Sequence, residues 1–251
     1  MSPSFKPWIH SGETLLGDDL TRYRSIVGSC LYYAVKTRED CLYAASTLAR
    51  YFVGATSTHM RAAHKLLAYM YHTRNKTAKI YFEGPRLGLT VYTDASFITD
   101  LEDCRSVYGI KIFYGRSLVH FVSKKIRVLC SSTTEAEHIA LAQGIRQGYW
   151  MEQILQERRP EKVIDMYSDS QSALKWAREE ETKQSRYIPL RYHIARQAVL
   201  EGRISITYIQ TDKQPADELT KAKMPPERTQ KKSKAAGKGL KRKPKGRVKR
   251  K

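Results

Sequence analysis

The chain lacks the features of secreted, zinc-binding and membrane-spanning proteins. Its four cysteines, at positions 30, 41, 104 and 130, form no C-x-x-C pair and no spacing typical of a zinc site. No secretory segment precedes them. No apolar run approaches the ~20 residues that a membrane-spanning helix needs. These absences predict an intracellular, soluble protein with reduced thiols and no membrane partner.

Acidic residues are also scarce, with 25 Asp and Glu against 45 Lys and Arg, and the imbalance is concentrated at one end. Residues 221–251 hold fifteen basic residues and one acid, Glu227, a net of +14 out of the total of +20. This stretch has no aromatic residue and almost no large apolar residue, so it cannot bury enough surface to fold alone. We therefore predict that residues 224–251 form a disordered basic tail that binds nucleic acid non-specifically through counterion release.

The same tail fits a second role. Lys241-Arg242-Lys243 and Lys249-Arg250-Lys251 are basic clusters of the kind that nuclear-import receptors bind. This predicts a nuclear protein, with some of it in the cytoplasm, and an import receptor as a partner. A solvated basic arm and an import signal can coexist.

The first 86 residues predict a small helical unit. Residues 1–22 contain Pro3, Pro7, Gly12 and Gly17 and little periodicity, so we expect an extended lead-in. Residues 23–86 carry apolar residues at helical spacing. A break at T-R-E-D, with Thr37 as the N-cap, divides the first part into two helices, and a third helix follows Thr56.

From position 87 the apolar period changes to two. Strands are predicted at L-T-V-Y-T-D-A, Y-G-I-K-I-F-Y, L-V-H-F-V-S, V-I-D-M-Y-S and R-I-S-I-T-Y-I. Helices are predicted at 134–156, at 170–178, at 190–201 and from Pro215 onward, the first with Ile139, Ala142, Ile145, Trp150 and Ile154 facing inward. Residues 87–223 therefore form an α/β domain, a mixed five-stranded sheet flanked by helices.

Four of the few acids stand in matching contexts. Asp94 and Asp169 follow apolar strands, and Glu137 and Asp217 lie in the first turns of helices, where the helix dipole favours negative charge. If the first and fourth strands are parallel neighbours, all four carboxylates can meet at one edge of the sheet. Any single one of them is also explained as a helix cap or a turn residue.

Clustered carboxylates need a cation. Oxygen ligands suit Mg²⁺ or Mn²⁺, and two such ions about 3.5–4 Å apart can activate a water and stabilise the leaving 3′ oxygen of a phosphodiester. The sequence therefore predicts a two-metal nuclease.

The motifs T-D-A-S, E-A-E-x-x-A-L, S-D-S-Q-S-A and A-D-E-L-T resemble the four active-site blocks of ribonuclease H. The wider set Y-R-S-I-V-G-S-x-L-Y, S-S-T-T-E-A-E-H-I-A-L and Q-P-A-D-E-L-T-K resembles the C-terminal connection and ribonuclease H region of copia-type (Ty1-like) retrotransposon Pol polyproteins. The resemblance implies cleavage of the RNA strand of RNA/DNA hybrids with two Mg²⁺ ions. It implies Asp94, Glu137, Asp169 and Asp217 as catalytic and metal-binding residues.

The resemblance leaves a competing glutamate, Glu135, two residues before Glu137. The resemblance favours Glu137, because the catalytic glutamate of the family is followed directly by an apolar helical run, as Glu137 is here. Copia-type chains usually have K-H-I-D before R-Y-H, whereas Arg186-Tyr187-Ile188-Pro189-Leu190 stands here. No protease or integrase signature is present, so both a polyprotein fragment and a host gene derived from an element fit.

An RNA/DNA hybrid is recognised through phosphates, groove shape and 2′-hydroxyls, which calls for basic and hydroxyl side chains. The expected nucleic-acid-binding residues are Arg105, Ser106, Lys124, Lys125, Ser131, Ser132, Ser170 and Gln171. Each is also explained as an ordinary surface residue. The alternative function is a catalytically silent nucleic-acid-binding protein that keeps the fold and the basic tail.

Overall fold

A computed structural model describes residues 11–75, 81, 88–100, 103–155, 163–178 and 194–221. The predicted basic tail with its import clusters, residues 1–10 of the predicted lead-in and the divergent segment 186–190 lie outside the described residues. In the described part, no helix is both long and apolar enough to cross a membrane.

Three helices form a unit with its own core: α1 (Gly17–Thr37), α2 (Glu39–Ala49) and α3 (Ser57–His72). Their apolar faces meet around the fully buried side chains of Tyr23, Val27 and Leu48. The Tyr23 hydroxyl donates a 2.7 Å hydrogen bond to the Leu48 carbonyl, so this buried polar group is satisfied.

Two details of this unit differ from the prediction. α1 begins at Gly17, inside the segment predicted to be extended, because Asp18 and Asp19 supply the acidic first turn that the helix dipole favours. The predicted break is present, but Thr37 does not cap α2: the N-cap is Arg38, and the Thr37 hydroxyl donates back to the Tyr33 carbonyl at 3.2 Å.

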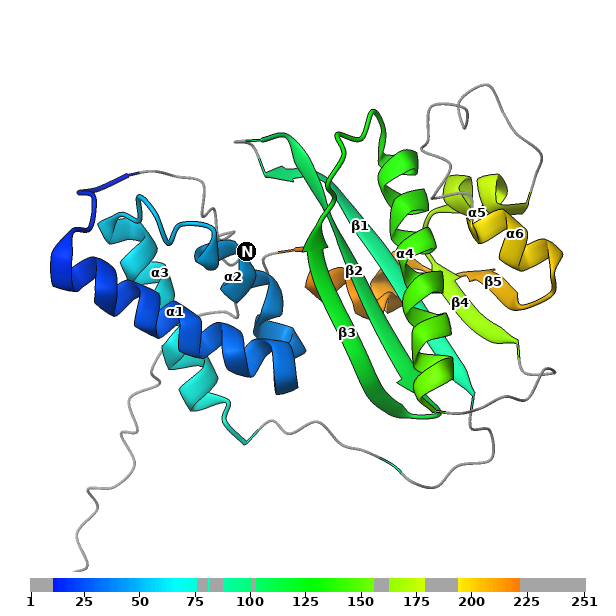
Figure 1. The fold of residues 1–251 in the computed structure, drawn as a ribbon, viewed down its shortest axis with the longest axis horizontal. Coiled ribbons are helices and arrows are strands. Elements are labelled where there is room, and N and C mark those ends of the chain that lie inside the picture. Colours follow the sequence, from blue (N-terminus) through cyan, green and yellow to red (C-terminus); the bar gives the residue numbers. More distant parts are fainter. Residues whose placement is uncertain are drawn as a thin grey trace, which may run out of the picture.

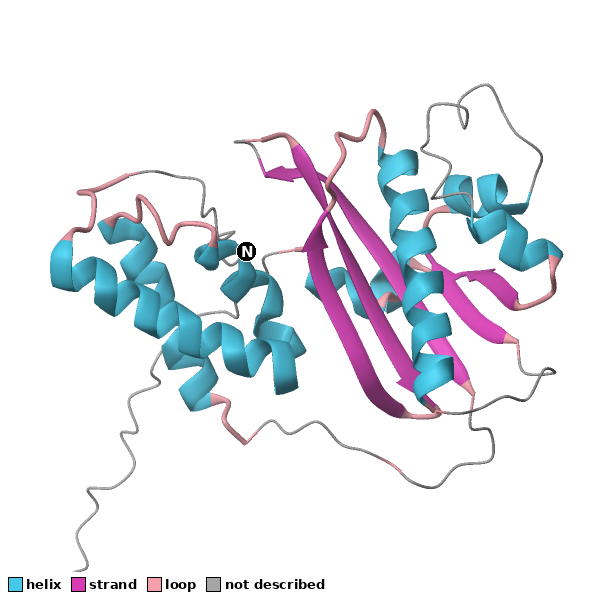
Figure 2. Cartoon of the chain, in the orientation of Figure 1, coloured by secondary structure: helices cyan, strands magenta, loops and turns pink. Residues whose placement is uncertain are grey.

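The second unit contains the predicted mixed sheet, drawn in magenta in Figure 2, with strand order β3-β2-β1-β4-β5. Its strands are β1 (Leu89–Asp100), β2 (Arg105–Tyr114), β3 (Ser117–Lys125), β4 (Ile164–Ser168) and β5 (Ile204–Tyr208). The first three form an antiparallel meander, and β4 is parallel to both β1 and β5. The predicted α/β class and the parallel pairing of the first and fourth strands are confirmed.

One face of this sheet is covered by α4 (Thr133–Ile154), with α5 (Gln171–Arg178) and α6 (Ile194–Leu200) beside it (Figure 1). Gly144 lets α4 approach closely, since a Cβ there would lie 2.4 Å from Cγ2 of Thr93. Ile139, Ala142 and Ile145 are buried as predicted, but Trp150 and Ile154 are exposed. Trp150 lies about 140° around the helix from Ile145, so both cannot face the sheet.

Against β1 and β2 lies η4 (Pro215–Leu219), reached through the short turn η3 (Thr211–Lys213). Pro215 opens it as predicted, but the element is a 3₁₀ turn of five residues and not a longer helix. The Gln214 side-chain oxygen accepts from the Ala216 N–H at 3.4 Å. η4 also contacts α2, so it lies where the two units meet.

Candidate active site

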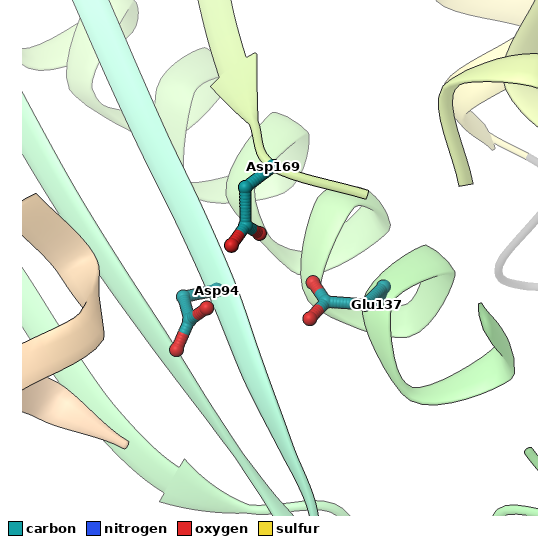
Figure 3. A group of neighbouring side chains, drawn as sticks. All are labelled: Asp94, Glu137 and Asp169. Atoms are coloured by element: carbon teal, nitrogen blue, oxygen red, sulfur yellow. The ribbon is translucent and has the colours of Figure 1, made fainter. Parts of the chain in front are cut away.

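Asp94, Glu137 and Asp169 come together from three elements (Figure 3). Each offers a carboxylate oxygen, and these three oxygens lie within 4.8 Å of one another. Asp94 is in the middle of β1, not at its end as predicted, because β1 continues to Asp100. The parallel pairing of β1 with β4 stops at Tyr92↔Tyr167, however, so Asp94 and Asp169 both lie just beyond the paired stretch.

Glu137 projects from the first turns of α4 toward the two aspartates (Figure 3). Glu135 has a different role: its Oε2 accepts 2.7 Å hydrogen bonds from the backbone N–H and the hydroxyl of Ser131. Its own N–H donates to the Ser132 hydroxyl at 3.1 Å, which caps the helix. Glu135 is thus held in the helix start, and the geometry favours Glu137 as the glutamate of the cluster.

The cluster cannot hold all its negative charge unaided. Burial, followed by the charges of Asp94 and Asp169, raises the pKa of Glu137 to about 9, against a hydrogen bond from the Ala95 backbone and the charge of Lys221. Burial also raises the pKa of Asp94 to about 6, although a hydrogen bond from Thr220 acts in the opposite direction. At neutral pH Glu137 therefore keeps its proton unless a cation replaces it, and Asp94 becomes protonated as well when the pH falls below about 6.

These residues fit a divalent metal. Glu137 Oε2 is buried and has no hydrogen-bond partner among the described residues. An orphaned buried carboxylate oxygen costs free energy unless a proton or a cation satisfies it. Three hard oxygen ligands converging on one point are the donor set that Mg²⁺ and Mn²⁺ prefer.

The fourth predicted residue, Asp217, stands beside this group and not in it. It is buried in η4, and its Oδ1 is ion-paired with Nζ of Lys221, one turn further along. Its negative charge contributes to the raised pKa of Asp94, which places it near the cluster. The structure therefore gives three converging carboxylates with an Asp–Lys pair next to them.

Sequence reasoning missed the side chains that hold these acids in place. The Thr220 hydroxyl donates to Oδ2 of Asp94, and the Thr211 hydroxyl donates to Oδ2 of Asp169 at 2.8 Å. The signal for Thr220 was available, because it lies three residues after Asp217, inside the motif A-D-E-L-T-K.

The predicted nucleic-acid contacts in the meander fall into two groups. Lys124 is exposed, and Lys125 and Arg105 both approach Asp103, at 2.7 and 3.7 Å. Ser106 is fully buried, and its hydroxyl accepts a 3.2 Å hydrogen bond from the Ile98 N–H. This burial argues against Ser106 as a nucleic-acid contact and gives it a structural role in the irregular end of β1.

The predicted contacts on helices are mostly caps. Ser131 and Ser132 organise the start of α4, as described above. The Ser170 hydroxyl accepts from the Ala173 N–H at 3.2 Å and starts α5 in the same way. Gln171, the first residue of α5, is exposed. Apart from Ser106, these positions remain predicted contacts.

The fold and the acidic cluster together define a ribonuclease H-like α/β domain joined to a helical unit. No protein-family profile matches the chain. Curated proteins do match it: the Pol polyprotein of the Arabidopsis thaliana transposon RE1 is 32% identical over 88% of the chain, and that of the Nicotiana tabacum transposon TNT 1-94 is 31% identical over 79%. The chain is therefore a homologue of the copia-type retrotransposon Pol polyproteins over most of its own length.

The chain spans about 15% of the length of these two relatives. Solved structures that resemble it include the N-terminal ribonuclease H domain of a Mycobacterium tuberculosis protein, with 12% identity and a TM-score of 0.40 over 54% of this chain and 91% of that one. The ribonuclease LC11-RNase H1, solved in complex with an RNA/DNA hybrid, gives 15% identity and a TM-score of 0.39 over 52% and 92%. The family assignment rests on the Pol relatives.

Proposed function

We propose that this chain is an endoribonuclease that hydrolyses the RNA strand of RNA/DNA hybrids, leaving 5′-phosphate and 3′-hydroxyl ends. The observation that carries the proposal is the convergence of Asp94, Glu137 and Asp169, which each offer a carboxylate oxygen within 4.8 Å of the others. The buried Glu137 Oε2, which has no hydrogen-bond partner among the described residues, adds to it. Homology to the retrotransposon Pol polyproteins supports it.

In this proposal Asp94, Glu137 and Asp169 hold the cations, and Asp217 supplies a fourth carboxylate. Two bound Mg²⁺ or Mn²⁺ ions would supply an activated water and stabilise the leaving 3′ oxygen. The chain's own contribution is orientation: the threonine hydroxyls bonded to Asp94 and Asp169 fix which carboxylate oxygens face the cluster. The buried setting keeps bulk water from screening these charges.

Hybrid binding is proposed for the predicted basic and hydroxyl side chains of the antiparallel meander and of the helix starts. Lys124, Lys125, Arg105 and Gln171 have side chains at least partly open to solvent. Ser131, Ser132 and Ser170 lie at helix starts, where backbone N–H groups favour phosphate. The basic tail would add non-specific affinity for nucleic acid and, in a cell, contact with an import receptor.

Purified full chain incubated with end-labelled hybrid and Mg²⁺ tests the proposal. Asp94→Asn is expected to abolish cleavage while hybrid binding stays largely intact, because one neutralised ligand disrupts the metal site and not the phosphate contacts. Asp165→Asn, the same change at an exposed acid on β4, is the matched control and should cleave normally. Saturated binding without cleavage by the native chain would establish the silent binding protein instead.

The tail has its own test. A fluorescent fusion that lacks residues 229–251 is expected to leave the nucleus, since both import clusters are removed. An unchanged distribution would remove the proposed nuclear import.

A further inference from the structure

The segment that carries Asp217 is held from two sides. η4 packs against β1 and β2 on one side and against α2 on the other. Leu219, its last residue, is completely buried, and it belongs to the hydrophobic core of the three-helix unit. The next residue, Thr220, donates the hydrogen bond to Asp94. Leu219, in the core of the helical unit, is therefore directly followed in the chain by the residue that hydrogen-bonds to Asp94 of the acidic cluster.

A buried lysine on β2 forms ion pairs with both η4 and α2. Lys111 points from β2 and is 5% exposed. Its ammonium is ion-paired with Glu218 of η4, and it lies 4.0 Å from Oε1 of Glu39 at the start of α2. A buried ammonium needs its carboxylates, so these partners restrain the position of η4 relative to both units.

There is little room for η4 to move. A Cβ at Gly109, opposite Asp94 on β2, would lie 2.7 Å from Cβ of Leu219 and 2.9 Å from the Ala216 carbonyl oxygen. The Ser123 hydroxyl of β3 donates a 2.6 Å hydrogen bond to the Leu219 carbonyl. The sheet therefore packs closely against one side of η4, and α2 of the helical unit contacts η4 as well.

We propose that the helical unit acts as a positioning element of the acidic cluster, with Leu219 and Glu39 as positioning residues. By holding η4 against the sheet, the unit keeps Asp217 and Thr220 beside Asp94. The inference rests on the proposed function for its catalytic consequence. Its structural part, that helical-unit contacts order residues 215–221, stands apart from any activity.

Amide hydrogen exchange of the full chain without metal tests the structural part. Glu39→Gln and Leu219→Ala are expected to speed exchange in residues 215–221 by about fivefold or more, as local opening becomes easier. Leu219→Met, which conserves volume, should restore slow exchange. Glu152→Gln, which loses the 3.1 Å ion pair with Arg203, is the control for the charge change.

A second control separates positioning from general loss of stability. Leu141→Ala removes a fully buried leucine from the core of the sheet. It should speed exchange throughout the unit that contains the sheet, without a selective effect on residues 215–221. Equal exchange in these residues for Leu219→Ala and Leu141→Ala would overturn the proposal. Unchanged exchange in both Glu39→Gln and Leu219→Ala would overturn it as well.

The catalytic part is measured with Mg²⁺ titrations of hybrid cleavage. Glu39→Gln is expected to raise the Mg²⁺ concentration for half-maximal rate by about threefold or more, with KM for the hybrid unchanged. A raised KM with unchanged Mg²⁺ dependence would contradict a positioning role and point to substrate binding. If the native chain does not cleave, the proposed function fails, while the exchange experiment still decides whether the helical unit orders η4.

Discussion

Metal binding at neutral pH should release a proton from Glu137. Burial and the neighbouring aspartates raise the pKa of this carboxyl to about 9. A carboxyl must lose its proton before it can bind a cation through that oxygen, so binding and deprotonation are linked. Replacing Glu137 by Gln removes the titrating group and leaves a side chain of almost the same shape.

The number of protons released, and the pH dependence of Mg²⁺ affinity, follow from the raised pKa values of Glu137 and Asp94. With a pKa of about 9, the protonated form of Glu137 exceeds the ionised form by about 100-fold at pH 7. About one proton should therefore leave per site on binding. Apparent Mg²⁺ affinity should rise about tenfold per pH unit between roughly pH 6 and pH 9 and level off above that. Below pH 6 the slope should steepen, because Asp94, with a pKa of about 6, is protonated too.

Calorimetric titration of Mg²⁺ into the full chain, in two buffers that differ in ionisation enthalpy, counts the released protons. Glu137→Gln should bind more weakly and release almost none at pH 7, whereas Glu152→Gln, outside the cluster, should match the native chain. Native binding without proton release at pH 7, or with an affinity that stays flat from pH 6 to pH 9, would refute the reasoning.

Three further predictions concern stability, each measured by denaturant unfolding without metal. In the folded chain Glu137 keeps its proton up to a pH of about 9, whereas in the unfolded chain it loses the proton above its ordinary pKa of 4.5. The stability of the native chain should therefore fall as pH rises from about 4.5 to 9. Glu137→Gln should remove this contribution of Glu137 and stabilise the fold by up to about 3 kcal/mol at pH 7. Gly109→Ala should destabilise by about 1–3 kcal/mol through the clash with Leu219, whereas Gly28→Ala, in open space on α1, should stabilise by about 0.5–1 kcal/mol. Ser132→Ala should cost about 1 kcal/mol by removing the cap of α4.

Periodicity was sufficient to predict the sheet. The switch from helical spacing to alternation at position 87 predicted five strands, and all five are present. Asp94 and Asp169 could be paired from sequence because the first and fourth strands are parallel neighbours. The structure shows that their pairing stops just before both residues, although β1 itself continues past Asp94. The choice of Glu137 over Glu135 came from the resemblance, and the structure adds the physical reason: Glu135 is bonded to Ser131 at the helix start.

The errors come from residues whose environment is set by distant parts of the chain. Ser106 looks like a surface hydroxyl beside Arg105, but an irregular strand end folds over it and takes its hydrogen bond. Leu219 looks like one more apolar residue of a C-terminal helix, but it packs into a core built from residues about 150 to 200 positions earlier. No local pattern reports contacts at that separation.

Asp217 shows the same effect within the site. Its motif alone places it with the other three acids, yet the structure pairs it with Lys221. Burial acts to lower the pKa of Lys221, but the hydrogen bond and charge of Asp217 outweigh it and raise that pKa, so the lysine stays charged. That positive charge in turn lowers the pKa of both Asp94 and Glu137. Lys221 thus offsets part of the repulsion in the cluster. Because its partner Asp217 lies on η4, the contacts that seat η4 also affect how readily Asp94 and Glu137 ionise.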